Sequence, residues 1–544
     1  MPLSANFDGK TVTRPGAYAN TKSAIQNPIA GISNGTVLLL DTGVLGADGF
    51  GAGAGVLGER VSGAKSVSTF TGRDQMRAAV RGGQVWQLAR PLFNPAGLGS
   101  KGAPKVLYLR AAATVAAKLT LTFASGGKLP LVALNEGTVA NGVVTSNELT
   151  AGLATRLKVA PGSTTKFILE LWGATYKGLD PSGDAYDFVA IGDAPAERLA
   201  ASPAVSDVAD LIAWVKRDKV AQQFVGIGAG ATAGAIVAAD VTSFAGYQVL
   251  IGGTITYSPA ALTAALQAIA NLDYTFLLSD QYGANAQGSV NTQLLAHLLT
   301  KAKYQKFMIV GGGADADAFS SVGGTLDTTA FYDSERVTVV HAGLELKRTD
   351  GGLKAYSQYY KAAAYAGLRA SKAPQVPCTF KNLEMDGDVH ELNDDEITAA
   401  LAGGALVTVN DDQLGYVVLQ DINSLQGARN EHMVNEDGTS YENSISLILA
   451  ALCKQLVIKA KIELFSDPDG VNRNTLEEID VQQWLEGQLD KATATKAVDN
   501  LIRYADTIVV TTDQDAYRAS FRAEPNFPIN KLFLTGFLID RSAQ

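Results

Sequence analysis

The sequence predicts a multidomain protein of mixed α/β and α+β class, with a mixed β-sheet at its core. At 544 residues the chain has room for roughly three or four domains of about 150 residues each. Expected helices and strands alternate between residues 207 and 310, as in βαβ units around a partly parallel sheet. Between residues 114 and 177, Thr, Val and Leu are frequent and helical periodicity is absent, which indicates a mostly β insertion.

The first quarter of the chain begins with an extended arm over residues 1–25 and then enters the core. Strand-forming residues flank a Pro15 and Gly16 turn signal in this arm, which has little apolar surface of its own to bury. A short apolar run predicts a strand at 36–41, followed by a glycine-rich loop. A helix over 73–90 and a strand over 105–110 are expected next.

The middle of the chain contains the clearest alternation of elements. Apolar residues at 208, 211, 212 and 215 lie on one face of a helix expected at 207–216. The other expected elements are strands at 118–123 and 166–172 in the β insertion, helices at 261–269 and 290–302, and strands at 274–279 and 306–310.

The last third is expected to form a separate module. Residues 374–377, with proline at both ends, suggest a linker, and a short helix at 395–401 leads into a strand at 405–410. Apolar residues at 445, 448, 449, 452 and 456 share one face of a long helix. Thr475 and Glu478 form a capping box for a second helix. Strands are expected at 506–512, 517–522 and 531–539.

The composition indicates a folded protein and disfavours nucleic acid as a partner. Hydrophobic residues make up 47% of the chain and charged residues 18%, which is enough to bury several cores. The net charge is -9, and the longest basic runs are the pairs at 216–217 and 347–348. An acidic chain without a basic stripe repels the phosphate backbone.

The sequence also favours a soluble protein without membrane insertion. The first residues lack the basic and apolar regions of a secretory signal, and Cys378 and Cys453 belong to no metal or redox motif. The most apolar window, residues 445–458, contains Lys454 and is shorter than the roughly 20 residues that a bilayer span needs.

The glycine-rich motifs match no nucleotide site in full. The motif from Gly226 to Ala231 resembles a dinucleotide fingerprint, but the next acid, Asp240, is too near, and the glycines from Gly311 are more simply a loop. Residues 58–66 place a lysine one position too late for a phosphate-binding loop. In the G-x-S-x-G motif at 31–35, the expected strand follows the serine instead of preceding it.

The histidines and acidic residues indicate neither a metal site nor a catalytic apparatus. The four histidines are far apart and outside any HExxH pattern. Asp386, Asp388 and His390 could share a strand face, and 467–470 resembles part of a calcium loop whose glycine comes two positions early. Solvated acidic loops are the preferred interpretation of both. We therefore expect no catalytic residue, no metal, no cofactor and no enzymatic activity.

Several segments resemble the contractile tail sheath proteins, which form the outer cylinder of contractile phage tails and related injection machines. Residues 14–18, Arg-Pro-Gly-Ala-Tyr, resemble the PG-x-Y segment of that family's N-terminal arm. Residues 369–373 resemble the end of the helix before its C-terminal module. Within 370–544, the glycines at 403–404, the segment 417–426, the long helix, the capped helix and a final strand follow the family's order. The middle is similar only in its order of elements.

The resemblance implies a structural subunit with a mixed-sheet sheath core, a C-terminal αβ module, an inserted mostly-β outer domain and extended terminal arms. The implied divisions are 1–25 for the N-terminal linking arm, 26–114 for the first part of the sheath core and outer domain, 115–195 for the β-rich inserted domain, 196–370 for an α/β domain, 371–529 for the C-terminal inner module and 530–544 for the C-terminal linking strand.

Both termini are expected to link neighbouring subunits by strand addition. An arm that cannot bury itself and an apolar final strand suit such a joint, in which backbone hydrogen bonds supply affinity. The alternative is that both termini pair within their own subunit. The linking residues that the resemblance implies are Val12, Arg14, Pro15, Gly16, Tyr18, Leu532, Phe533, Leu534, Phe537 and Ile539.

The implied partners are copies of the chain in stacked sixfold rings that form a helical homopolymer, the tail tube protein, and the baseplate and tail terminator proteins. The implied location is the virion tail, after assembly in the host cytoplasm, and the implied function is contraction that drives the tube through the host cell envelope. Two other interpretations stay open, an α/β enzyme that binds a nucleotide at the Gly226 or Gly311 loop and another virion or shell protein.

Overall fold

The computed structural model divides the chain into two compact units. The smaller unit comprises Met1–Ser33 and Leu447–Asn526, and the larger unit comprises Asn34–Ser446 and Phe527–Gln544. The residues that the structure describes are 5–7, 10–12, 35–41, 67–79, 83–110, 112–136, 140–173, 196–257, 259–279, 288–301, 306–313, 319–320, 324–347, 352–426, 440–464, 477–493, 501–513 and 516–525.

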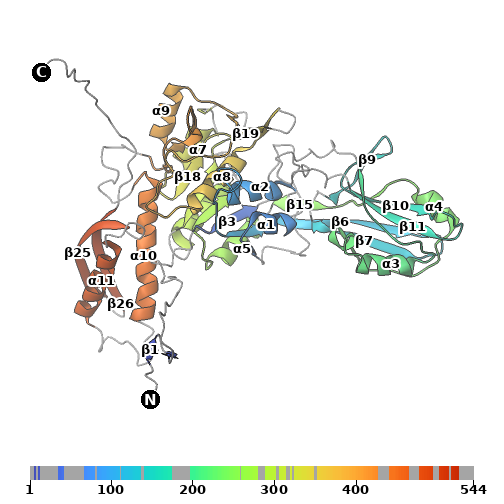
Figure 1. Cartoon of the computed structure of the whole chain (residues 1–544), viewed down its shortest axis with the longest axis horizontal. Helices are drawn as coiled ribbons and strands as arrows, with labels where there is room; N and C mark the ends of the chain where they lie inside the picture. Colours follow the sequence, from blue (N-terminus) through green and yellow to red (C-terminus); the bar gives the residue numbers. More distant parts are fainter. Residues whose placement is uncertain are drawn as a thin grey trace. The chain divides into compact units, whose positions relative to one another are not determined.

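A seven-stranded sheet, which includes β3 and β18 in Figure 1, forms the core of the larger unit, and its strand order is β22-β18-β17-β16-β3-β5-β4. All neighbours are parallel except β4 and β5, which are antiparallel. The strands are β3 (Val37–Asp41), β4 (Ser68–Phe70), β5 (Val106–Arg110), β16 (Phe276–Ser279), β17 (Phe307–Gly311), β18 (Val337–Val340) and β22 (Ala405–Leu406). Because their side chains are buried on both faces, the central strands are continuous apolar runs. The predicted partly parallel sheet is confirmed.

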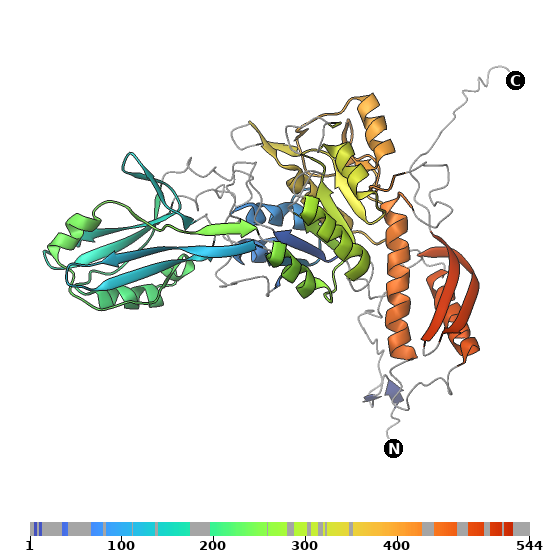
Figure 2. The same ribbon diagram turned by 180° about the vertical axis from the view of Figure 1, so that it is seen from behind.

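Helices supply the rest of the apolar core around this sheet. They are α1 (Arg73–Ala79), α2 (Gly83–Phe93), α5 (Pro259–Ile269), α6 (Gly288–Ala296) with a π-helical turn at His297–Lys301, α7 (Thr325–Tyr332) and α8 (Gln358–Ala370). Figure 2 shows α5 alongside the sheet, and its Leu262 and Ile269 are fully buried in the core cluster. The single helix expected at 73–90 is two helices, because paired glycines at 82–83 make helix continuation unfavourable.

The β insertion is a β domain that spans residues 112–257. Its two four-stranded sheets have the orders β13-β7-β6-β15 and β12-β11-β10-β14. The strands are β6 (Ala112–Thr122), β7 (Lys128–Glu136), β10 (Leu153–Val159), β11 (Phe167–Gly173), β12 (Glu197–Ala201), β13 (Val225–Ile227), β14 (Gln248–Val249) and β15 (Thr254–Tyr257), with a small hairpin of β8 (Val143–Thr145) and β9 (Glu148–Ala151).

This β domain extends well past residue 195, where the sequence analysis placed its end. Its apolar core runs from Ala117 to Leu250 and includes the buried face of α3 (Val208–Arg217). The strands β13 to β15 complete the two sheets, and α4 (Ala238–Phe244) packs Phe244 against Phe123. The difference arises because the helical pattern at 207–216 indicated a change of fold class, whereas the apolar face of α3 is buried within the β domain.

The remainder of the larger unit follows α8. A three-stranded sheet joins β19 (Leu344–Lys347), β20 (Leu353–Tyr356) and β21 (Gly387–Asp388), and a hairpin joins β23 (Thr408–Asp411) and β24 (Gly415–Val418). Helix α9 (Asp394–Gly403) begins with the capping box of Asn393 and Glu396. The single strand expected at 405–410 is therefore divided between β22 and β23.

The expected linker at 374–377 is wrong, because these residues wrap around a buried arginine. The guanidinium of Arg369, 1% exposed, donates to the carbonyls of Ala373, Pro374 and Val376 at 3.3, 2.7 and 2.6 Å. A buried guanidinium must have its donors satisfied, so the turn after α8 is part of the fold.

The described core of the smaller unit is two helices and a hairpin. Helix α10 (Asn443–Glu463) continues into this unit from its first residues in the larger one, and α11 (Glu478–Thr493) and the strands β25 (Ile502–Asp513) and β26 (Ala516–Pro525) complete the apolar cluster. The backbone N–H of Glu477 donates to Asp480 at the start of α11. Thr475, the expected cap, lies outside the described residues.

Helix α10 is longer than the apolar window in the sequence suggested. Within the described residues, Asn443–Ala460 is the one segment long and apolar enough to cross a bilayer, with a mean hydropathy of 1.4. However, 61% of this segment is buried inside the structure, as in the core helix of a soluble protein. Residues such as Ile448 and Leu452, both 1% exposed, belong to the protein core.

Candidate assembly surface

The structure describes one of the ten expected linking residues. Val12 is the last residue of β2 (Lys10–Val12), which pairs antiparallel with β1 (Ala5–Phe7), and Val12 is the partner of Ala5. The start of the arm therefore forms a local hairpin. The other nine lie outside the described residues, namely Arg14, Pro15, Gly16, Tyr18, Leu532, Phe533, Leu534, Phe537 and Ile539.

The hairpin of β25 and β26 is the element of the smaller unit best suited to receive a linking strand. It is 12 residues long on one side and 10 on the other, and among the described strands each pairs only with the other. Both outer edges of this sheet therefore carry backbone groups that no described strand satisfies. Strands were expected at 506–512 and 517–522, but the sequence gave no sign that they form a two-stranded sheet.

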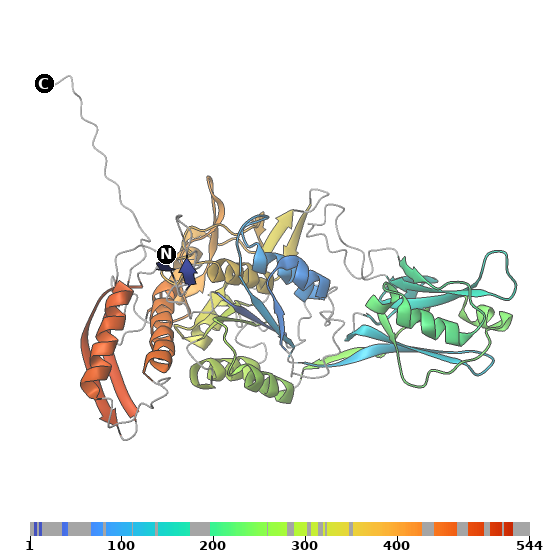
Figure 3. The same ribbon diagram turned by 60° about the horizontal axis from the view of Figure 1, so that its bottom comes forward.

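The two faces of this hairpin differ in exposure. Ile502, which is 1% exposed, belongs to the apolar cluster, and Ile508 packs against it, whereas Tyr504 and Val509 are 58% and 46% exposed. Helix α11 covers the apolar face (Figure 3). One face is thus fixed against the core, which sets the register of the strands.

A β-bulge interrupts the pairing of the hairpin near its middle. The register shifts between Asp506 and Val509, and Thr507 within the shift has φ of +51°. Before the bulge, the exposed side chain of Arg503 pairs with Glu524 of β26 at 3.5 Å. The bulge and the charged residues restrict where along this hairpin a further strand can pair, so an added strand must avoid the bulge.

Polar contacts hold the helices beneath the hairpin together. The indole N–H of Trp484 in α11 donates to Glu463 of α10 at 2.7 Å, and the Gln488 amide donates to the same carboxylate oxygen at 2.9 Å. Lys459 of α10 donates to the Gln488 carbonyl oxygen at 2.8 Å. These bonds join the end of α10 to the middle of α11 beside the apolar cluster, so the two helices beneath the hairpin are bonded to each other.

A buried polar network in the larger unit surrounds the first residue of α10. The amide nitrogen of Asn443 donates to Tyr365 at 2.9 Å and to Asp421 at 3.1 Å, and its carbonyl oxygen accepts from Thr338 of β18 at 3.1 Å. Asp421, which is 0% exposed, also lies 3.9 Å from the guanidinium of Arg369. The start of α10 is therefore bonded to the central sheet and to α8.

A second buried cluster lies beside the carboxyl end of β18. Lys361 of α8, which is 0% exposed, is hydrogen-bonded to Asp388 of β21, which also accepts from Thr408 of β23 at 2.8 Å. His341 follows β18 and contacts Thr325 at 2.8 Å. Burial, with the positive charge of Lys361 nearby, lowers the pKa of His341 to about 4. These groups connect four elements of the larger unit.

The acidic residues that sequence reasoning considered as metal ligands have structural partners. Asp386 accepts from the backbone N–H of Lys347 at 2.7 Å, Asp388 pairs with Lys361, and the ring of His390 contacts that of His341 at 5.7 Å between centroids. Residues 467–470 lie outside the described residues. Among the residues that the structure does describe, no three His, Cys, Asp or Glu side chains converge as a metal site would require.

The glycine motifs also take structural roles where the structure describes them. Gly226 lies in β13, which pairs antiparallel with β7 and therefore does not open a βαβ unit. Gly311 ends β17, and a Cβ there would lie 2.3 Å from a side-chain carbon of Gln358. The absence of a side chain at Gly311 thus permits close packing of α8. The motifs at 31–34 and 58–66 lie outside the described residues.

Comparison with known proteins identifies the fold. The sequence matches no protein-family model and none of the curated proteins. The sheath tail protein from Desulfitobacterium hafniense is similar with a TM-score of 0.54 and 17% identity, over 94% of this chain and 97% of that chain. The sheath tail protein from Listeria innocua is similar with a TM-score of 0.49 and 17% identity, over 94% and 96%. The anti-feeding prophage helical sheath in its contracted state is similar with a TM-score of 0.36 and 16% identity, over 54% and 78%.

The first of these comparisons spans almost the whole of both chains at a TM-score above 0.5. It shows that this chain has the fold of a tail sheath protein, and it confirms the resemblance found in the sequence.

Proposed function

We propose that this chain, which has the fold of a tail sheath protein, is the structural subunit of a contractile sheath and not an enzyme. The observation that carries the proposal is the similarity in fold over 94% of the chain. A second observation supports the proposal. The two ends of the chain, where the subunits of a polymer would be linked, resemble the terminal segments of tail sheath proteins in sequence. Fold alone does not define function, so the proposal also depends on the geometry of the assembly surface.

In this proposal the terminal arms of neighbouring copies add strands to the β25–β26 hairpin. The hairpin supports this role because its edges are unpaired among the described strands while α11 covers one face. A strand added at an edge gains backbone hydrogen bonds along its length, and alternating side chains fix its register. The arm that supplies the strand and the hairpin that receives it are different surfaces of the subunit. The contact can therefore repeat from subunit to subunit and build rings or helices.

Contraction would then be a change between two lattices of the same subunits. The extended lattice is held kinetically, and the contracted lattice gains contacts between subunits. If contraction is favourable by about 1 kcal/mol per subunit, coupling across many subunits makes it effectively irreversible. This mechanism needs no bound nucleotide.

The partners in this proposal are other copies of the chain in sixfold stacked rings, an enclosed tail tube, and the baseplate and terminator at the two ends. The C-terminal module, residues 371–529, would face the tube, and the β domain would lie on the outside, where it does not obstruct assembly. The location would be the tail of a virion or related particle assembled in the host cytoplasm, and contraction would drive the tube through the host envelope.

Electron microscopy of the purified full-length chain tests the proposal. We expect long, hollow, striated cylinders whose amount is unchanged by ATP or GTP. Single molecules at every concentration and ionic condition tried would contradict the proposal, and assembly that requires a nucleotide would favour the α/β enzyme alternative.

A further inference from the structure

A turn at residues 378–381 of the larger unit holds an exposed aromatic ring on strained backbone. The backbone N–H of Lys381 donates to the carbonyl of Cys378 at 3.0 Å, which closes the turn. Phe380, the third residue of the turn, has φ of +57°. That position suits glycine or asparagine and is unfavourable for a bulky side chain. Phe380 is nevertheless 48% exposed, so intramolecular packing does not explain its presence.

Hydrogen bonds fix this turn in place. The backbone N–H of Cys378 donates to the Asp421 carboxylate at 2.8 Å, and the Thr379 hydroxyl accepts from the backbone N–H of Asp421 at 3.1 Å. The backbone N–H of Phe380 donates to the carbonyl of Val418 in β24 at 2.7 Å. Strain of this kind persists only where the surroundings impose it, and it is concentrated at functional positions.

Other exposed apolar residues and a positive charge accompany Phe380. Leu414 is 48% exposed and its carbonyl accepts from the side-chain amide of Asn382, two residues after Phe380. Val376 is 37% exposed. Lys381 is exposed, and no described acidic group pairs with its ammonium. We call Val376, Phe380, Lys381 and Leu414 the Phe380 patch. Apolar patches with a polar rim are typical of protein interaction sites.

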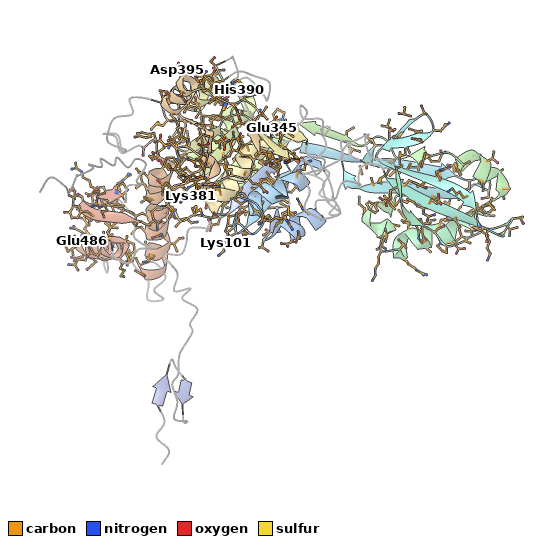
Figure 4. The ribbon with its side chains drawn as sticks, turned by 45° about the horizontal axis from the view of Figure 1, so that its top comes forward. Lys101, Glu345, Lys381, His390, Asp395 and Glu486 are labelled. Carbon is orange, nitrogen blue, oxygen red and sulfur yellow. The ribbon has the colours of Figure 1, made fainter. Side chains whose placement is uncertain are left out.

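A surface of complementary charge lies elsewhere on the same unit, at the start of α9. Asp394 and Asp395 are exposed in its first turn, and their carboxylates have no cationic partner among the described residues. Leu392 and Ile397, which flank the two acids in the sequence, are only partly buried against the apolar cluster around Ala400, so part of each side chain stays exposed. Figure 4 shows Asp395 and Lys381 well apart on the larger unit, so the two surfaces do not meet within one molecule.

We propose that the Phe380 patch docks on the first turn of α9 in a second copy of this chain. The ring of Phe380 covers Leu392 and Ile397 of that copy, and Lys381 pairs with its aspartates. Because the two surfaces differ, the contact is heterologous and propagates along a polymer instead of closing a dimer. The inference rests on the proposed function, since it requires a polymer of this chain.

Substitutions at Phe380 separate this role from a role in stability. Phe380→Asn removes the ring and relieves the strain, because asparagine tolerates left-handed backbone. We expect its thermal midpoint as a monomer to rise by about 1–2 °C and its critical concentration for assembly to rise by about tenfold. Phe380→Ala should weaken assembly equally without the gain in midpoint, and Phe380→Tyr should assemble like the parent.

Ser146→Gly is the matched control, because Ser146 also has a positive φ, of 52°, in the β8–β9 turn but is not part of the patch. It should relieve strain and leave assembly unchanged. Assembly of Phe380→Asn at the parental critical concentration would overturn the proposal. Loss of folding in that variant would overturn it too, because the ring would then have a structural role.

Charge reversal tests which molecule receives the patch. Lys381→Glu and Asp395→Lys should each reduce assembly, and the chain that carries both substitutions should recover it, measured by sedimentation and electron microscopy. Failure of the double variant to recover, while the single variants are impaired, would show that the partner is another surface, such as the tube protein. Failure of the parent chain to assemble would instead refute the proposed function itself.

Discussion

Replacing Asp421 by asparagine is expected to destabilise the larger unit by about 3–5 kcal/mol, the usual cost of breaking a buried ion pair by removing one partner. Asp421 is 0% exposed and accepts hydrogen bonds from Tyr365, Asn443 and the backbone of Cys378, while the guanidinium of Arg369 lies 3.9 Å away. Asparagine has nearly the same shape as aspartate, but it carries no charge, so the buried guanidinium of Arg369 loses its anionic partner. Its NH2 group also replaces a carboxylate oxygen that accepted hydrogen bonds.

Calorimetry of Asp421→Asn and the parent, both as monomers, measures this loss. For the larger unit we expect a transition lower by at least about 5 °C, with faster hydrogen exchange in α8 and at the start of α10. Asp74→Asn is the matched control, since Asp74 pairs with Arg73 at 3.0 Å but its side chain is 84% exposed. It should change stability by less than about 0.5 kcal/mol. Equal effects of the two substitutions would show that burial of the Asp421 carboxylate beside Arg369 does not stabilise the larger unit.

Three further predictions concern particular sites. Burial lowers the pKa of His341 to about 4 from an unfolded value near 6.5, so the unfolded state binds the proton first as pH falls. Stability should therefore decrease by about 3 kcal/mol between pH 6.5 and 4, and pH-dependent melting of His341→Gln should show a shallower decrease. Thr507→Gly should stabilise the smaller unit by about 1 kcal/mol in calorimetry, because Thr507 has φ of +51°; a lower midpoint would contradict this. Gly35→Ala should leave little soluble protein, because Gly35 has φ of +58° and a Cβ there would lie 1.8 Å from the Ala370 carbonyl oxygen. Gly72→Ala is the control and should express normally, because a Cβ at Gly72 would meet open space.

The sequence predicted elements where one strong pattern determined the local structure. The run at 36–41 could only be a buried strand, and the spacing of apolar residues after 445 indicated the helix that the structure has at Asn443–Glu463. The alternation expected from 207 to 310 correctly predicted the parallel arrangement of β16 and β17, but its first part, up to residue 257, belongs to the antiparallel β domain. In these places the local preference and the tertiary environment agree.

The sequence could not predict contacts between residues far apart in the chain. Arg369 and Asp421 are 52 positions apart, so the sequence did not show that the Arg369 side chain is buried. Pro374 therefore suggested a linker, although its carbonyl accepts a hydrogen bond from that buried arginine. The end of the β domain was missed for a similar reason, since the helix expected at 207–216 is α3, whose apolar face belongs to a β core. The turn at Phe380 could not be predicted from the sequence, because its position of positive φ, where glycine or asparagine is usual, holds a phenylalanine.

Removal of residues 1–20 tests the central claim most directly, that the ends of this chain link it to its neighbours. The full-length and truncated chains would be compared by sedimentation and electron microscopy at matched concentration, with circular dichroism to compare their folding. We expect cylinders from the full-length chain and folded, monomeric protein from the truncated one. Cylinders of normal length and number from the truncated chain would contradict it.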